Sequence, residues 1–269
     1  MRWRILPQAP QAAFQSLRGQ RLRLGLGLVV CLAGSSVAAR PLPLSERVAA
    51  ADDYYLGREK PENVAKGLEL LRADVAENLA DYEAWWRISK FLYYQAGRAS
   101  EPDKIKLLEG GIDAAKRAIA LDPNRAEGHY WLGANYDLMS EARGYWRGLL
   151  FLDDIREQME TANGFNPDYE QDGAMVTIAR LDFRAPFFKG GDKRLSIQLL
   201  KECLQHFPEN SRAMLYLSDS YLAMGLRKEA HEELDSILNL CPDPQVAPEL
   251  AENQEEARAR LAKYFSAKP

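Results

Sequence analysis

The sequence predicts an all-α fold, namely an α-solenoid of about five helical hairpins followed by a C-terminal capping helix. Two observations lead to this prediction. One pattern of apolar and small residues recurs along the chain at helical spacing, and its copies end in prolines, at Pro123, Pro167, Pro208 and Pro242. A single amphipathic hairpin cannot bury its apolar face alone, so the copies are expected to stack on one another.

Residues 211–242 are the most regular copy. They read as two amphipathic helices joined by a turn at Met224, Gly225 and Leu226. The residues at the repeat positions are Leu217, Tyr221, Ala230, Leu234, Ile237 and Pro242. Ser218 stands where the pattern prefers glycine, and Met214 where it prefers tryptophan.

The other predicted elements follow in order along the chain. Four earlier hairpins pair residues 46–56 with 61–78, 82–94 with 104–121, 126–136 with 155–167, and 172–185 with 193–208. Ser45 and Asp192 are suited to cap helices, because their side-chain oxygens can accept hydrogen bonds from free backbone N–H groups. The predicted domain boundaries are a signal peptide at 1–39, a linker at 40–45, repeats at 46–247 and a capping helix at 248–269.

These positions resemble the tetratricopeptide-repeat (TPR) superfamily over nearly all of residues 46–242. Within it, the segment LDFRAPFFKGGDKRLSIQLLKECL at 181–204 is similar to exported bacterial repeat proteins that include the T component of TRAP transporters. That resemblance implies a periplasmic accessory to a solute-binding protein. A more distant similarity is to eukaryotic regulators of microtubule dynamics, against which the export signal argues.

The N-terminus carries this signal. Three arginines precede the apolar run LGLGLVVCLAG at 24–34, and small residues follow up to Ala39. This order is typical of a secretory signal cleaved after Ala39, giving a periplasmic or secreted protein. The alternatives are a retained anchor, an organellar transit peptide, or a lipoprotein modified at Cys31. We expect membrane contact only if the N-terminus is retained or Cys31 is lipidated.

Charge argues against nucleic acid as a partner. The whole chain has a net charge of -4, and no acidic residue precedes Glu46. After cleavage at Ala39, 30 basic and 39 acidic residues remain, and such an acidic body does not suit a polyphosphate. Of the two remaining cysteines, Cys203 and Cys241, the spacing favours two small buried side chains over a disulfide.

No catalytic, metal or cofactor site is predicted. His129 falls at a core position, and Cys203 with His206 lacks a second pair of ligands for a metal. The glycines at 190 and 191 do not have the spacing of a phosphate-binding loop. The sequence therefore predicts a protein that is not an enzyme and uses no cofactor.

Binding is the predicted function, through the concave face that the first helix of each hairpin lines. Aromatic rings supply contact area there and cations meet acidic groups. We expect a protein or peptide partner in the cell envelope; the alternative is a small apolar ligand of a TRAP-type transporter, and homo-oligomerisation stays open. The candidate partner-binding residues are Trp86, Lys90, Tyr93, Tyr130, Arg180, Arg212 and Asp219.

Two apolar clusters fall outside the repeat pattern. Tyr145 and Trp146 lie in the long third connection, and Phe187 and Phe188 in the fourth. The pattern favours packing of these rings back over the solenoid. The alternative is a docking patch for a partner protein, another subunit or a membrane surface.

Overall fold

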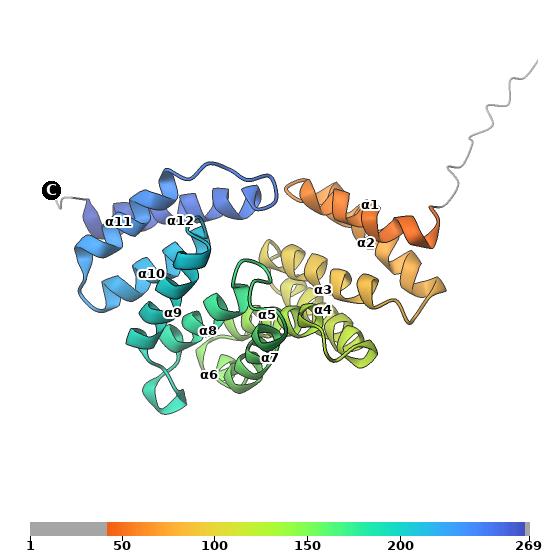
Figure 1. The fold of residues 1–269 in the computed structure, drawn as a ribbon, viewed down its shortest axis with the longest axis horizontal. Coiled ribbons are helices and arrows are strands. Elements are labelled where there is room, and N and C mark those ends of the chain that lie inside the picture. The colour runs from red at the N-terminus through yellow and green to blue at the C-terminus, as the bar shows by residue number, and fades with distance from the viewer. Residues whose placement is uncertain (1–41, 267–269) are drawn as a thin grey trace, which may run out of the picture. The chain divides into compact units, whose positions relative to one another are not determined.

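The computed structural model describes residues 42–266, which are helical throughout except for their connections (Figure 1). Signal cleavage, the state of Cys31 and the first two residues of the predicted linker, 40 and 41, lie outside the described residues. The helices are α1 (Leu44–Leu56), α2 (Pro61–Glu77), α3 (Tyr82–Gly97), α4 (Asp103–Leu121), α5 (Ala126–Ala142), α6 (Tyr145–Gly148), α7 (Leu152–Phe165), α8 (Gly173–Arg184), η1 (Phe187–Lys189), α9 (Lys193–His206), α10 (Ser211–Ala223), α11 (Arg227–Leu238) and α12 (Ala247–Phe265).

The helices pair in the predicted order. The five antiparallel hairpins are α1 with α2, α3 with α4, α5 with α7, α8 with α9, and α10 with α11. Each hairpin packs on the next through α2 and α3, α4 and α5, α7 and α8, and α9 and α10. The last helix, α12, covers α10 and α11. The predicted all-α solenoid with a C-terminal capping helix is therefore confirmed.

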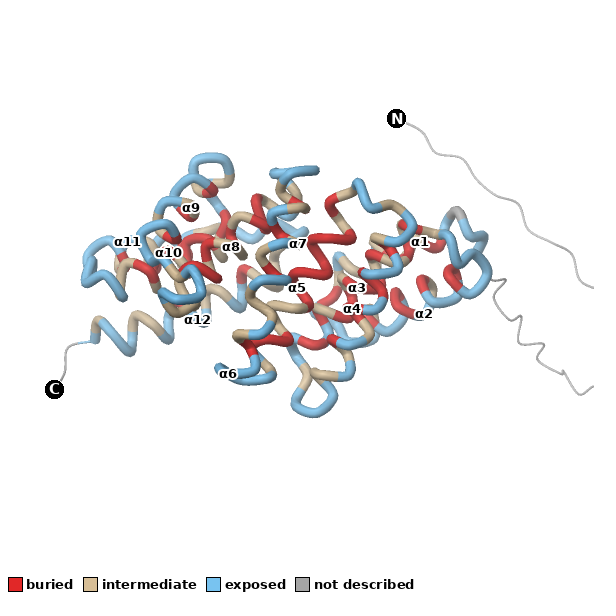
Figure 2. Tube along the Cα trace, turned by 90° about the horizontal axis from the view of Figure 1, so that it is seen from below, coloured by how far each residue is buried: buried red, intermediate tan, exposed pale blue. Residues whose placement is uncertain are grey.

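Each hairpin buries one stripe of its helices against the neighbouring hairpins, and exposed residues lie on the outer turns (Figure 2). Phe91 of α3 is fully buried among Leu71, Val75 and other apolar side chains. A Cβ atom added at Gly67 of α2 would lie only 2.3 Å from the Phe91 ring. Glycine at this repeat position therefore lets the ring pack directly on the helix backbone.

Side-chain caps satisfy backbone N–H groups at the N-termini of α9 and α10. The Asp192 carboxylate accepts hydrogen bonds from the backbone N–H groups of Arg194 at 2.8 Å and Leu195 at 3.2 Å, so its predicted role as a cap is confirmed. Asn210 accepts one from Ala213 at 2.9 Å in the same way. Helix α1 begins at Leu44 with Pro43 at its N-cap position, so the prediction that Ser45 caps this helix is wrong.

The two cysteines in the described part of the chain are not bonded to each other. Cys203 is fully buried, and burial raises the pKa of its thiol to about 12, which makes it unreactive at neutral pH. Cys241 is exposed, so the prediction that both side chains are buried is wrong for Cys241. It follows the last turn of α11, beyond the buried stripe of that helix.

The two ends of the solenoid are joined by hydrogen bonds. Arg58, in the turn between α1 and α2, donates from Nε to the Glu249 carboxylate of α12 at 2.9 Å and from Nη2 to the Gln245 carbonyl at 2.6 Å. Arg98 at the end of α3 pairs with Glu252 one turn further along α12. The first and last elements of the array therefore border one enclosed space.

Candidate binding cavity

A cavity of about 640 Å³ lies between the first helices of the hairpins and α12. Its wall comes from α1, α3, α5, α8, α10 and α12, which are far apart in the sequence. Four of the seven predicted partner-binding residues line it, namely Lys90, Tyr93, Tyr130 and Arg212. The first helix of a hairpin faces the concave side of a solenoid, which is why these positions converge.

Arg212, in the first turn of α10, is the unusual group in this wall. Among residues 42–266 its guanidinium has no hydrogen-bond or ion-pair partner within the chain. Burial opposes its charge, but the nearby Tyr93 and Tyr216 hydroxyls and other groups raise the pKa of Arg212 above its ordinary value. The cavity therefore holds a permanent cation whose five N–H donors are free to meet an anion.

Lys90, by contrast, is already neutralised. Its ammonium lies 2.8 Å from the Glu170 carboxylate, 4.6 Å from the centre of the Tyr55 ring and 5.3 Å from that of Trp131. These contacts hold the side chain against the wall. An incoming anion would have to displace Glu170, so Lys90 is a weaker attachment point than Arg212.

The turn before α8 forms part of the wall in an uncommon conformation. Glu170, Gln171 and Asp172 have φ values of 51°, 57° and 58°, a left-handed run of three residues with side chains. Such a conformation costs about 1–2 kcal/mol per residue unless surrounding contacts hold it. Two contacts do so: the Asn210 amide donates to the Gln171 carbonyl at 2.8 Å, and the buried Asp172 carboxylate lies 3.3 Å from His206.

Three predicted binding residues are instead engaged in intramolecular contacts. Arg180 of α8 pairs with Asp219 of α10 at 2.9 Å, and Arg260 of α12 approaches the same carboxylate at 2.7 Å. Trp86 is 8 % exposed and donates its indole N–H to Glu83 at 2.9 Å. None of the three lines the cavity, and their role in binding a partner stays a prediction.

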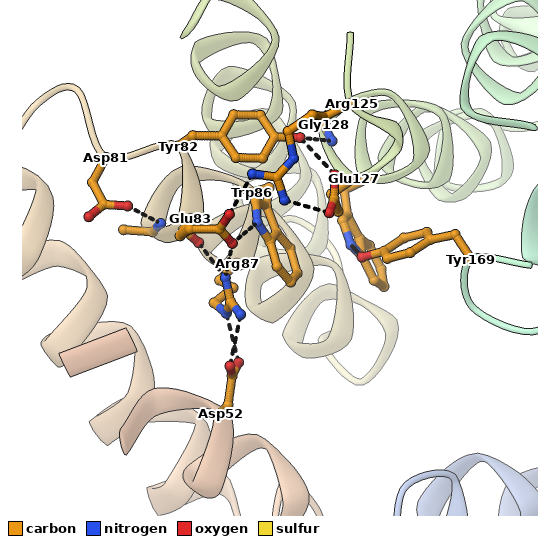
Figure 3. Close-up of polar contacts among 12 residues, drawn as sticks. Asp52, Asp81, Tyr82, Glu83, Trp86, Arg87, Arg125, Glu127, Gly128 and Tyr169 are labelled. Atoms are coloured by element: carbon orange, nitrogen blue, oxygen red, sulfur yellow. Dashed lines mark hydrogen bonds and ion pairs between the residues drawn. The ribbon is translucent and has the colours of Figure 1, made fainter. Parts of the chain in front are cut away.

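The Trp86 side chain belongs to a polar network between α1, α3 and α5 (Figure 3). The Arg87 guanidinium stacks on its ring at 4.0 Å and reaches Asp52 of α1 at 2.8 Å. On the other side, Arg125 bridges the Glu83 and Glu127 carboxylates at 2.5 and 2.7 Å. This network fixes the relative position of three hairpins.

The sequence pattern did not indicate Arg58, Glu170 or Glu249 as parts of the cavity. Arg58 and Glu170 lie in turns, where the repeat has no fixed position, and Glu249 lies on the capping helix. Pairing of Arg58 with Glu249 spans 191 residues. Since a repeat pattern specifies contacts between neighbours only, no signal in the sequence links these ends.

Asp137 of α5 carries a pH-dependent charge beside this region. Burial raises the pKa of its carboxyl to about 6, although Arg184 at 3.5 Å lowers it. The unfolded chain releases this proton at about pH 3.9. The folded state therefore binds the extra proton, and its stability falls as pH rises from about 4 to about 6.

We expect the variant Asp137→Asn to lose this contribution. Urea unfolding at pH 4, 5, 6 and 7 should show the difference in unfolding free energy between variant and native protein shifting in favour of the variant by about 1–3 kcal/mol as pH rises through this window. The exposed Asp154→Asn serves as a control and should leave the pH profile unchanged. A constant difference at all four pH values would contradict the assignment.

The remaining titratable side chains include one buried histidine, His129. Among the described residues, no group of three or more His, Cys, Asp or Glu side chains could hold a metal ion. His129 is 8 % exposed, with its ring nitrogens 2.8 Å from the Gln158 side chain and 2.9 Å from the Pro123 carbonyl, as its core position predicts.

Within residues 42–266, no helix combines the length and the apolar character that a membrane span requires.

Two family models match the sequence in separate parts. Residues 48–173 match the model for regulator of microtubule dynamics protein 1-3, and residues 191–263 match a tetratricopeptide-repeat model. The first match covers slightly less than half of the chain. No curated protein sequence matches. The similarity to a T component of TRAP transporters stays a prediction.

Several solved structures are similar to this chain. A thermophilic TPR protein of Thermus thermophilus, TTC0263, is 19% identical with a TM-score of 0.56, over 82% of this chain and 98% of that one. The MamA protein is 16% identical with a TM-score of 0.45, over 84% and 99% of the two chains. Residues 191–263 thus match a tetratricopeptide-repeat model, and the chain shares its fold with the Thermus TPR protein.

Proposed function

We propose that this protein is a non-catalytic scaffold whose central cavity holds a carboxylate-bearing segment of a partner polypeptide. The observation that carries the proposal is Arg212, a cation with no partner among the described residues and with aromatic rings around it. The Arg212 guanidinium is partly exposed, and such a group pairs well with a carboxylate, because two parallel N–H donors match its two oxygens. Tyr93 and Tyr130 offer the adjoining apolar area and hydroxyl groups.

The shape of the cavity favours a chain end or a short loop over a long extended strand. The Arg58 contacts with Glu249 and Gln245 close one side of the cavity. A segment that enters from the open side and terminates at Arg212 avoids breaking these contacts. The C-terminal carboxylate of a partner, or an acidic side chain near its end, fits this arrangement.

The test compares peptides that differ in one charge. Fluorescent random octapeptides with a free C-terminal carboxylate would be titrated beside the same peptides with a C-terminal amide. We expect measurable affinity for the carboxylate set, and about 30-fold or more weaker binding by Arg212→Leu, since loss of one partner of a desolvated ion pair has effects of this size. Arg212→Lys should retain part of the affinity.

The matched control is Arg117→Leu, which removes an exposed arginine of α4 away from the cavity. It should bind like the native protein. Equal binding of the carboxylate and amide peptides, or native affinity in Arg212→Leu, would overturn the proposal. Unfolding curves of each variant would separate lost binding from lost folding.

The cavity volume also supports a second candidate, an accessory of solute transport that holds a small molecule. Ligand pockets commonly have volumes of about 300–1,000 Å³, and 640 Å³ falls within that range. Native mass spectrometry of the purified protein distinguishes the two functions. A bound small anion that is absent from Arg212→Leu would favour the transport function over the peptide scaffold.

A further inference from the structure

Two short segments present large apolar side chains to solvent. The short helix α6 and the residues just after it expose Tyr145, Trp146 and Leu150 by 59%, 76% and 78%. The turn η1 exposes Phe187 by 91% and Phe188 by 76%. The prediction that these rings pack back over the solenoid is therefore wrong. We call these five side chains the apolar tip.

The two segments lie on the same side of the solenoid. In Figure 1, α6 stands to the left of α7, on the side of α8 and α9, whose connection contains η1. An ion pair between Lys189 of η1 and Asp153, in the first turn of α7, at 3.2 Å places η1 beside the helix that follows α6. A single surface approaching from this side would meet both segments.

The connection that carries Tyr145 and Trp146 is packed closely against α5, so these exposed rings do not stand on a loose loop. Gly148 of α6 packs so closely on α5 that an added Cβ atom would lie 2.5 Å from the Ser140 carbonyl oxygen. Phe151 turns inward and packs on Tyr136 with ring centres 5.8 Å apart. One aromatic residue of this connection thus packs in the core. Tyr145 and Trp146 remain exposed, with their ring centres 5.2 Å apart.

Charge around the tip differs from that of the rest of the chain. The segments 143–154 and 185–194 carry five basic residues and three acidic ones, in a protein whose net charge is -4. Of the acidic residues, Asp153 is paired with Lys189 and Asp192 caps α9. Arg147 is exposed and has no partner among the described residues. Arg143 pairs with Glu109 at 3.3 Å, which leaves Arg147, Lys193 and Arg194 against Asp154 and Asp192, so the rim of the tip is weakly cationic.

We propose that the apolar tip docks on the surface of an anionic lipid bilayer. Tryptophan and tyrosine prefer the membrane–water interface, and arginine and lysine can hold their charged ends at the headgroups while their stems stay apolar. Anionic lipids attract such a rim. The rings stand on two separate segments and do not line the cavity, so a protein partner would need two matching pockets, whereas a fluid interface accepts them without any.

The test uses the full chain and vesicles of phosphatidylcholine with about 30% phosphatidylserine, beside vesicles of phosphatidylcholine alone. We expect binding to the anionic vesicles to fall at least about tenfold in Trp146→Ser/Phe188→Ser, because two exposed rings are lost. The control Leu79→Ser removes an equally exposed apolar side chain from the turn between α2 and α3. It should bind like the native protein.

The apolar run at 24–34 could itself bind vesicles in the full chain, so a second readout locates the contact. Brominated lipids quench tryptophan fluorescence at the interface, and comparison with Trp146→Phe isolates the emission of Trp146. Quenching of Trp146 is the expected result. Absence of that quenching would overturn the proposal.

Discussion

Replacing Phe91 with alanine is expected to lower the unfolding free energy by about 3–5 kcal/mol, the usual range for removal of a buried aromatic ring. Phe91 is fully buried, and its ring packs against the backbone of α2 at Gly67 and against the Tyr55 ring, with centres 4.9 Å apart. Its loss would leave a void between the first two hairpins. Urea unfolding followed by circular dichroism would measure the change.

Two further variants make this result interpretable. Phe91→Leu keeps most of the apolar volume and should lose less than half as much stability as the alanine variant. Phe188→Ala removes a ring that is 76 % exposed, and should change the unfolding free energy by no more than about 0.5 kcal/mol. A loss below about 1 kcal/mol in Phe91→Ala would show that the two hairpins do not share this core.

Removal of Arg156 is the second change with a large expected effect. Arg156 of α7 pairs with the Asp182 carboxylate of α8, which is 1 % exposed. In Arg156→Met the carboxylate would remain buried without its cation, at a loss of about 3–5 kcal/mol at pH 7. One oxygen of Asp182 already lacks a hydrogen-bond partner within the described part of the chain, which leaves little to compensate.

The pH dependence distinguishes a charge effect from a packing effect. Burial raises the pKa of Asp182, and Arg156 lowers it, so the pKa rises further in the variant. Once pH falls below that raised pKa, Asp182 becomes neutral and the difference between variant and native protein should shrink. The double variant Arg156→Met/Asp182→Asn should recover stability at pH 7. A difference that is constant with pH, and no recovery in the double variant, would assign the loss to packing.

Local features of this fold could be predicted because neighbouring residues determine them. Asp192 caps α9 through N–H groups two and three residues away, and Gly67 meets the ring of the adjacent hairpin at a fixed repeat position. The number of hairpins and the capping helix follow from the same periodicity. Each of these features depends on contacts within one repeat or between two consecutive repeats.

The cavity and the apolar tip depend on other information. Arg180 and Arg212 both stand near predicted concave positions, but Arg180 pairs with Asp219, which also pairs with Arg260, while Arg212 has no partner among the described residues. The second cation on Asp219, Arg260, comes from α12, which packs on α10. Apolar composition likewise favours burial of Trp146, whereas the close packing of Gly148 on α5 turns that ring outward.

The contact between Arg58 and Glu249 changes how this solenoid can open. In an open array of repeats, the two ends fray independently, because a terminal repeat loses only its single neighbour. Here the buried Arg58 guanidinium is held by α12, 191 residues along the chain. Detachment of either end leaves the same cation without its partner, so the termini are thermodynamically coupled. We therefore expect the first hairpin and the last helix to unfold as one cooperative unit.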